Sequence, residues 1–252
     1  LQLKPLLQDL VARETVLIGW LLLYLMEKKQ SEKSYKYFDL IMAAFVAVLL
    51  ISNIASTKIA NFFVFAFDAG TLLFPLSYIF NDVLTEVYGY KKSRRVIWAG
   101  FFSAAIASLY LWFVSMMPPA AGWENQAAFE AILGFVPRIF AASLVAYFAG
   151  EFANSFVLAK MKVWSKGKML WARTIGSTIV GEFVDTALFA TIAFLGVIPF
   201  DLFVALVISN YVFKVGVEVL FTPITYKVIG FLKKAEGVDV FDTNTDFNPF
   251  KA

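Results

Sequence analysis

Five ionisable residues lie inside long apolar stretches of this sequence: Glu151, Glu182, Asp185, Lys214 and Glu218. A charge near the centre of a bilayer costs at least a few kcal/mol unless it is paired or faces a polar cavity. Carboxylate and ammonium groups at such depth can bind a polar solute or carry a proton. Their recurrence with helical spacing on consecutive stretches predicts a small polar chamber that binds or transports a solute.

Two of these stretches carry near copies of the motif Gly-Glu-Phe-x-[Asn/Asp]-[Ser/Thr], which begins at Gly150 and again at Gly181. Each motif belongs to a polar stripe whose members are spaced i, i+4, i+8 and i+11, so that they share one helix face. The stripes are Ser143, Tyr147, Glu151 and Asn154, and Thr174, Thr178, Glu182 and Asp185. Because neighbouring spans run antiparallel, we expect the two stripes to face each other across a cavity.

A third stretch continues the pattern with Asn210, Lys214 and Glu218 at steps of four residues. At this spacing Lys214 and Glu218 can neutralise each other. The tripeptide Ile-Ser-Asn that ends at Asn210 also occurs earlier in the chain, where it ends at Asn53. Phe189, one turn beyond Asp185, is suited to stacking on a planar solute.

The alternative explanation is that the polar groups only hold membrane helices together, at well under about 2 kcal/mol each. We favour this explanation for the hydroxyl groups of Ser52, Ser108, Thr178 and Ser209. We favour function for the ionisable groups Glu151, Glu182, Asp185 and Lys214, because such groups are costly structural devices at depth. For Asp82 and Glu86 the two explanations stay open, because salt bridges to the basic cluster at 91–95 would also account for them.

The elements that must position these residues are membrane-spanning helices. The 252 residues are 60% hydrophobic, with a mean hydropathy of +0.72, and apolar runs of about 20 residues can cross a bilayer as helices. The predicted fold is an all-α polytopic membrane protein, a six-transmembrane-helix bundle. The spans are 38–61, 70–88, 94–117, 138–160, 173–196 and 201–228. The second span holds Gly70 and Pro75 and is expected to be a broken or tilted helix.

The loops alternate in charge, with lysine and arginine before the first span and after the second, fourth and sixth. The positive-inside rule then predicts a multi-pass membrane protein with both termini in the cytoplasm. We divide the chain into an N-terminal segment 1–36, a transporter domain 37–234 and a polar, mobile cytoplasmic tail 235–252. Within the first segment, 6–26 is predicted to be an additional interfacial or partly inserted helix, with a seventh span as the alternative.

The composition excludes several function classes. The sequence has no Cys and no His, which removes thiol nucleophiles, Ser-His triads and the usual zinc sites, so we expect no metal, cofactor or catalytic residue. There is no Walker-type loop for ATP hydrolysis, and nothing indicates the pore rings or carbonyl filter of a channel. A transporter or a membrane-embedded binding subunit fits best. An intramembrane enzyme is the disfavoured third class.

Several blocks together resemble a known family. They are 74–90, 94–98, Arg138 followed by 150–155, 181–189 and 209–214. Over about residues 37–234 the sequence is similar to the YhhQ family of queuosine-precursor transporters. The resemblance implies a six-helix inner-membrane importer of 7-deazaguanines for tRNA modification, with 7-cyano-7-deazaguanine, 7-aminomethyl-7-deazaguanine or queuine as substrate. The layout is also similar to the substrate-binding subunits of energy-coupling-factor transporters, so an ATP-driven uptake complex is the alternative.

By motif position, the resemblance implies a ligand role for Asn53, Arg138, Glu151, Asn154, Asp185 and Lys214. The chemistry of the residues agrees, because a carboxylate can accept two adjacent N–H donors of a guanine-like edge while an amide or ammonium donates to its carbonyl. The full candidate set adds Tyr147, Glu182, Phe189 and Asn210, and Trp171 is a further ring for the planar face. The expected partners are the small-molecule substrate, the lipid bilayer and a second copy of the chain in a homodimer, with no nucleic acid.

Overall fold

The computed structural model describes residues 35–55, 58–62, 65–133, 137–196 and 199–251. The chain divides into two units, Leu1–Lys36 and Tyr37–Ala252, and the description below concerns the second. The predicted N-terminal helix at 6–26 lies outside the described residues.

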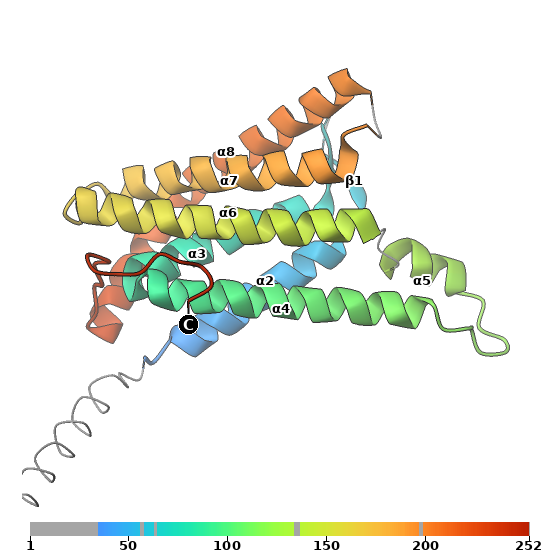
Figure 1. Ribbon diagram of the computed structural model, residues 1–252, viewed down its shortest axis with the longest axis horizontal. Coiled ribbons are helices and arrows are strands. Elements are labelled where there is room, and N and C mark those ends of the chain that lie inside the picture. Colours follow the sequence, from blue (N-terminus) through green and yellow to red (C-terminus); the bar gives the residue numbers. More distant parts are fainter. Residues whose placement is uncertain (1–34, 56–57, 63–64, 134–136, 197–198, 252) are drawn as a thin grey trace, which may run out of the picture. The chain divides into compact units, whose positions relative to one another are not determined.

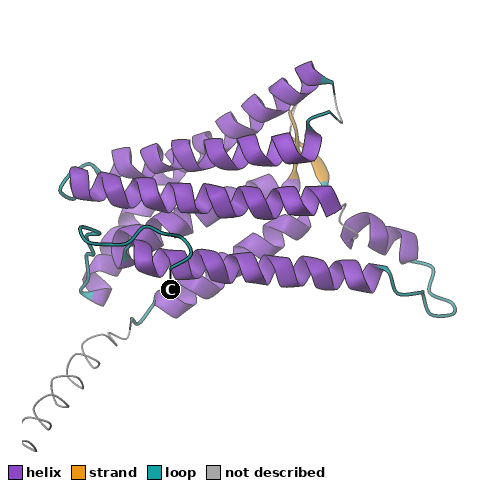
Figure 2. Ribbon diagram, viewed as in Figure 1, coloured by secondary structure: helices purple, strands orange, loops and turns teal. Residues whose placement is uncertain are grey.

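The described part of the second unit is built from α-helices with one short β-hairpin (Figures 1 and 2). The helices are α2 (Phe38–Ala55), α3 (Phe74–Tyr88), α4 (Tyr90–Ser115), α5 (Gln126–Leu133), α6 (Pro137–Trp164), α7 (Leu170–Phe194) and α8 (Phe200–Glu236). Five of them, α2, α4, α6, α7 and α8, are long and apolar enough to cross a membrane. The predicted class, a polytopic all-α membrane protein, is confirmed.

The predicted second span is irregular, as expected. Its helix, α3, has only 15 residues and is about 22 Å long, which is short of a hydrocarbon core of about 30 Å. A 3₁₀ turn, η1 (Ala69–Leu72), precedes it. The count of six spans therefore stays a prediction, with α3 as the element on which it depends.

The predicted first span, 38–61, is too long. α2 ends at Ala55, and β1 (Ile59–Phe62) pairs antiparallel with β2 (Phe65–Asp68). The backbone N–H of Ala69 donates to the carbonyl of Lys58 at 2.9 Å and closes the hairpin. Residues 59–67 are rich in aromatic and β-branched residues, which favour a strand over a helix when two such runs can pair.

α3 is the central element of the bundle, because it packs against α2, α4, α6 and α8. From Asn81 to Tyr88 every one of its residues is buried. The longer helices carry the apolar outer surface; on α4, for example, Phe102, Ile106, Leu109 and Tyr110 are each more than half exposed. Such a surface is expected where lipid, rather than water, surrounds the protein.

The C-terminal segment 238–251 is packed against the bundle, where the sequence predicted a mobile tail. Asp242 accepts a hydrogen bond from the backbone N–H of Tyr90 at 3.0 Å, at the start of α4, where no neighbouring side chain caps the helix. Tyr90 Oη and Trp98 Nε1 donate to the carbonyls of Phe247 and Pro249 at 2.9 and 2.8 Å. Figure 1 shows this segment, in dark red, beside the N-terminal end of α4. The tail therefore caps α4 and packs on its first turns.

Candidate substrate site

A column of buried polar side chains runs along one face of α3. Tyr78, Asp82 and Glu86 follow one another at steps of four residues, so they share one face of the helix, and none is more than 1% exposed. Around them, side chains from α6, α7 and α8 form three tiers, which we call the upper, middle and lower tiers. Tyr78, Asp82 and Glu86 belong to one tier each.

The upper tier is centred on Lys214 of α8. Its Nζ lies 2.7 Å from Asp185 Oδ2 and 3.1 Å from Glu182 Oε2, both on α7. The same ammonium lies 4.3 Å from the centre of the Phe74 ring, a cation–π distance. The sequence-based pairing of Lys214 with Glu218 is therefore wrong. One turn of helix separates those two, but α7 offers Lys214 two carboxylates at once.

Glu151 and Tyr78 complete the upper tier. Both are buried, and Glu151 lies within electrostatic range of Glu182 and Asp185. Neither carboxylate oxygen of Glu151 accepts a hydrogen bond of normal geometry from the described residues, and Tyr78 Oη has no partner among them either. A buried polar atom without a partner is expensive, so this tier is suited to a ligand that supplies several hydrogen bonds.

The repeated motif brings α6 and α7 into close contact. A Cβ added at Gly150 would lie 2.8 Å from Asp185 Cβ and 3.1 Å from the carbonyl oxygen of Gly181. One added at Gly181 would lie 2.7 Å from Asn154 Cβ. At the motif the helices therefore touch through their glycines rather than across a cavity, and the polar groups beside them reach α3 and α8 instead.

The middle tier holds Asp82 and Glu218. Asn154 Nδ2 donates to Asp82 Oδ1 at 2.7 Å and Ser177 Oγ donates to the same oxygen at 3.4 Å. Asp82 Oδ2 and both carboxylate oxygens of Glu218 have no hydrogen-bond partner among the described residues. Neither acid forms an ion pair there, although both are buried.

The lower tier is an ion-pair cluster around Glu86. Arg173 of α7 and Lys233 of α8 reach Glu86 Oε1 at 2.8 and 2.6 Å, and Lys162 of α6 lies 3.5 Å from it. Lys162 also contacts Asp239 of the tail at 2.5 Å. The alternative that Glu86 pairs with the basic cluster at 91–95 is wrong, because the three cations come from other helices. The spacing of Tyr78, Asp82 and Glu86 at steps of four residues is visible in the sequence and indicates a shared polar face. The sequence analysis did not identify this face as part of the site.

The structure thus brings together five predicted residues, Glu151, Asn154, Glu182, Asp185 and Lys214. Tyr147 is buried, and its hydroxyl donates to the carbonyl of Ile97 at 3.0 Å. Among the described residues, Asn53, Phe189 and Asn210 make no hydrogen bond or ion pair with the five; Phe189 packs on Phe194. Trp171 is exposed. Arg138 lies in the first turn of α6, but its side chain lies outside the described residues.

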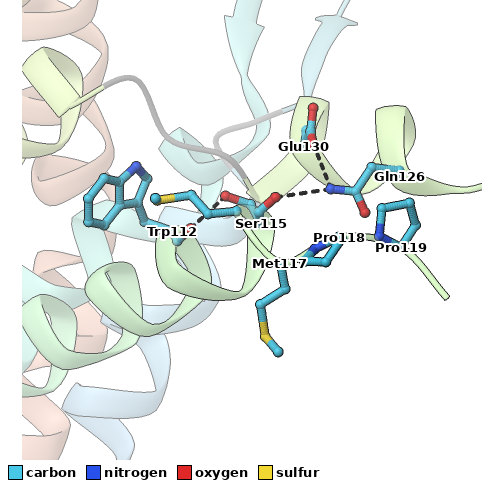
Figure 3. A pocket seen from close by; sticks show the side chains of 8 residues that line it. Trp112, Ser115, Met117, Pro118, Pro119, Gln126 and Glu130 are labelled. Atoms are coloured by element: carbon cyan, nitrogen blue, oxygen red, sulfur yellow. Dashed lines mark hydrogen bonds between the residues drawn. The ribbon is translucent and has the colours of Figure 1, made fainter.

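Two cavities lie elsewhere. One, of about 500 Å³, lies where α4 ends and α5 begins, with Gln126 donating to the carbonyl of Ser115 and to Glu130 (Figure 3). The other, of about 320 Å³, is an apolar groove lined by Tyr37, Phe80 and Phe231. Neither contains the buried acids. In the described part of the chain, no three acids are arranged to hold a metal ion.

Comparison with known proteins agrees with a transport role. Residues 68–228 match the family described as "Putative vitamin uptake transporter". The chain is 30% identical to the "Probable queuosine precursor transporter" of Bacillus subtilis over 176 residues, which is 69% of this chain and 77% of that protein. It is 27% identical to the "Queuosine precursor transporter" of Escherichia coli over 165 residues, or 64% of this chain and 71% of that one.

A "Probable queuosine precursor transporter" of Haemophilus influenzae is 28% identical over 176 residues, or 68% of this chain and 71% of that protein. No solved structure matches the chain. These relatives carry the names of transporters rather than enzymes, as the missing Cys and His residues led us to expect. With the family match covering more than half of its length, the chain belongs to this family of multi-pass membrane transporters.

Proposed function

We propose that this protein imports a queuosine precursor of the 7-deazaguanine class and that the upper tier binds it. The relatives are named queuosine precursor transporters, and the 7-deazaguanine class is what the sequence resemblance implies. The observation that carries the proposal is the buried group of three carboxylates, Glu151, Glu182 and Asp185, around the single ammonium of Lys214. A 7-deazaguanine presents the complementary set, with adjacent N–H donors beside a carbonyl acceptor.

Binding is an exchange of partners at Lys214. The N–H donors of the substrate replace the ammonium at Asp185 and Glu182, and the released ammonium donates to the substrate carbonyl. Phe74, which lies under Lys214 in the structure, is placed to contact the planar ring. A base that lacks these donors leaves the carboxylates unpaired, which is how the site discriminates.

The lower tier faces the cytoplasm in this proposal. The backbone N–H of Tyr37 donates to Glu236 at 2.7 Å, so α2 begins and α8 ends at the same side of the bundle. That side holds Lys162, Arg173 and Lys233, and an excess of basic residues is typical of the cytoplasmic side. The proposed location is the inner (plasma) membrane with both described ends cytoplasmic, and transport proceeds by alternating exposure of the upper tier. The homodimer stays a prediction.

Reconstitution of the purified full chain in liposomes tests the proposal. Vesicles preloaded with unlabelled 7-cyano-7-deazaguanine, 7-aminomethyl-7-deazaguanine or queuine should take up the same labelled compound by exchange, and protein-free vesicles should not. Guanine, which has the same edge, and adenine, which does not, distinguish readout of that edge from general base uptake. Binding of a precursor without any exchange would contradict autonomous transport and favour the alternative, a binding subunit that needs an ATP-driven partner.

A further inference from the structure

Asp82 and Glu218 are two buried acids that have no role in the proposed exchange of partners at Lys214. Asp82 is 0% exposed and Glu218 1%. Three of their four carboxylate oxygens have no hydrogen-bond partner among the described residues, since only Asp82 Oδ1 accepts donors. Each lies within electrostatic range of the other. They belong to different helices, α3 and α8, so the pair spans a packed helix interface.

The charges in the upper and middle tiers do not balance. Among the described side chains of these two tiers, five carboxyl groups (Glu151, Glu182, Asp185, Asp82 and Glu218) face the one ammonium of Lys214, so full ionisation would leave a net charge of −4. In the lower tier three cations face two acids, Glu86 and Asp239, so the three tiers together would still carry a net charge of −3. Several uncompensated charges inside a membrane bundle are not sustainable. Bound cations must therefore neutralise some of these acids.

The cation that fits here is a proton. A metal ion needs several oxygen ligands arranged around it, and no three acids among the described residues are so arranged. A proton needs only one oxygen, or two that share it, and Asp82 and Glu218 offer three unpartnered oxygens. Asn154 and Ser177, the neutral donors to Asp82, leave its second oxygen available.

We propose that Asp82 and Glu218 form a proton-binding site, separate from the substrate groups, and that precursor import is coupled to the proton it carries. The inference rests on the proposed function and adds its driving force. Asp82 faces Glu218 from α8, Glu151 and Asn154 from α6, Ser177 from α7, and Glu86 one turn along its own helix. Glu218 faces Asp82, Glu182 from α7, and Lys214 one turn along its own helix.

The coupling follows from what substrate does to Lys214. In the ligand-free arrangement, the positive charge of Lys214 compensates the carboxylates of Asp185 and Glu182. When the substrate displaces the ammonium, the local charge balance beside Glu218 changes, because Glu218 lies one turn from Lys214 and within range of Glu182. A proton held by the Asp82–Glu218 pair restores the balance. Substrate and proton therefore bind together and cross together.

The test uses the full chain in liposomes and compares two readouts. Counterflow exchange at equal pH needs no net proton movement and reports transport alone. Accumulation driven by an alkaline lumen reports coupling, and for one proton per substrate it should rise about tenfold per pH unit of gradient. A pH dye in the lumen should record proton entry with the substrate in the parent chain, which tests the inference without any variant.

Two variants locate the proton. Asp82→Asn keeps the oxygen to which Asn154 and Ser177 donate, and Glu218→Gln keeps the size of the side chain. Both should retain counterflow and lose gradient-driven accumulation. Asp201→Asn, at an exposed acid in the first turn of α8, is the matched control and should behave like the parent.

Each outcome decides the matter. Counterflow by the parent without any response to the pH gradient would overturn the coupling and leave the proposed function standing. Accumulation driven by a sodium gradient at equal pH would also overturn the coupling. Accumulation in both variants that responds to the pH gradient as in the parent would overturn it as well. Absence of counterflow with every precursor would remove the proposed function, and the coupling with it.

Discussion

At the scale of single residues, Lys214 holds the substrate site in its ligand-free arrangement. Its Nζ joins Asp185 and Glu182 at 2.7 and 3.1 Å, and all three side chains are at most 12% exposed. Removing one member of a buried ion pair leaves uncompensated charge, which costs far more than an exposed pair does. The residue therefore has both a structural and a ligand-binding role, and the two can be separated.

We expect Lys214→Gln to lower the free energy of unfolding by about 3–5 kcal/mol, because two buried carboxylates lose their cation. Adding Asp185→Asn should recover part of that loss but not the uptake, which needs both groups. Thermal unfolding in detergent and precursor exchange measure the two effects. Lys227→Gln, at an exposed lysine of the same helix, is the control. Unchanged unfolding in Lys214→Gln would show that the ion pair is not formed.

At the scale of elements, the glycines of the repeated motif set the distance between α6 and α7. A Cβ at Gly150 would also meet Tyr78 Oη at 2.5 Å, so α3 closes over the same contact. Gly150→Ala should destabilise the protein by about 1–3 kcal/mol through overpacking, because the neighbours include backbone that cannot move aside. Gly216→Ala on α8, with no atom within 4 Å of the new Cβ, should be neutral or stabilising by up to about 1 kcal/mol. Equal unfolding temperatures for the two variants would contradict this packing.

The tail is the second element with a measurable role. Burial alone would raise the pKa of the Asp239 carboxyl, but hydrogen bonds and ion pairs from Lys162 and Lys233 outweigh it and hold that pKa below its usual 3.8. A carboxylate with a depressed pKa stabilises the folded state fully above its unfolded-state pKa, and this contribution is lost as pH falls through the depressed value. Docking of 238–251 should therefore be constant from pH 8 to about pH 5 and weaken below about pH 4.

Hydrogen exchange of the tail amides, corrected for its intrinsic pH dependence, measures this docking. Asp239→Asn should weaken protection already at neutral pH and reduce the acid-induced change. Protection that is the same in the variant and the parent would mean that Asp239 does not hold the tail.

At the scale of the whole molecule, the lower tier closes one side of the bundle by joining α3, α6, α7 and α8 through Glu86. The chain has no cysteine, so a single introduced cysteine can be labelled without background. Thr225→Cys, at a buried position of α8, should resist a membrane-impermeant thiol reagent. Adding Glu86→Gln should raise its reactivity about tenfold if the cluster contributes about 1.4 kcal/mol to closure. Lys227→Cys should react in both backgrounds, and equal reactivity of Thr225→Cys in both would exclude Glu86 as the closing residue.

The sequence predicted the five long apolar helices and the ionisable residues within them, because both follow from local hydrophobicity. Glu151, Glu182, Asp185 and Lys214 were predicted as site residues because ionisable groups are costly in an apolar run, and Asn154 because it shares a helix face with Glu151. The sequence did not predict which ion pairs these residues form. Lys214 forms ion pairs with two acids of α7 rather than with Glu218 of its own helix. Glu86 forms ion pairs with cations from three helices. Such pairings depend on how helices far apart in sequence are packed. The hairpin at 59–68 was missed because apolar strands and helix ends have similar composition.

The most direct test of the account uses cells that cannot make 7-deazaguanines. With a precursor supplied at low concentration, expression of this chain should restore queuosine modification of tRNA. Asp185→Asn, matched for abundance in the membrane, should reduce the rescue about tenfold or more, because the substrate loses charge-assisted hydrogen bonds of about 1.5–3 kcal/mol. Failure of the parent chain to rescue with any precursor, or equal rescue by the variant, would contradict import through the buried polar site.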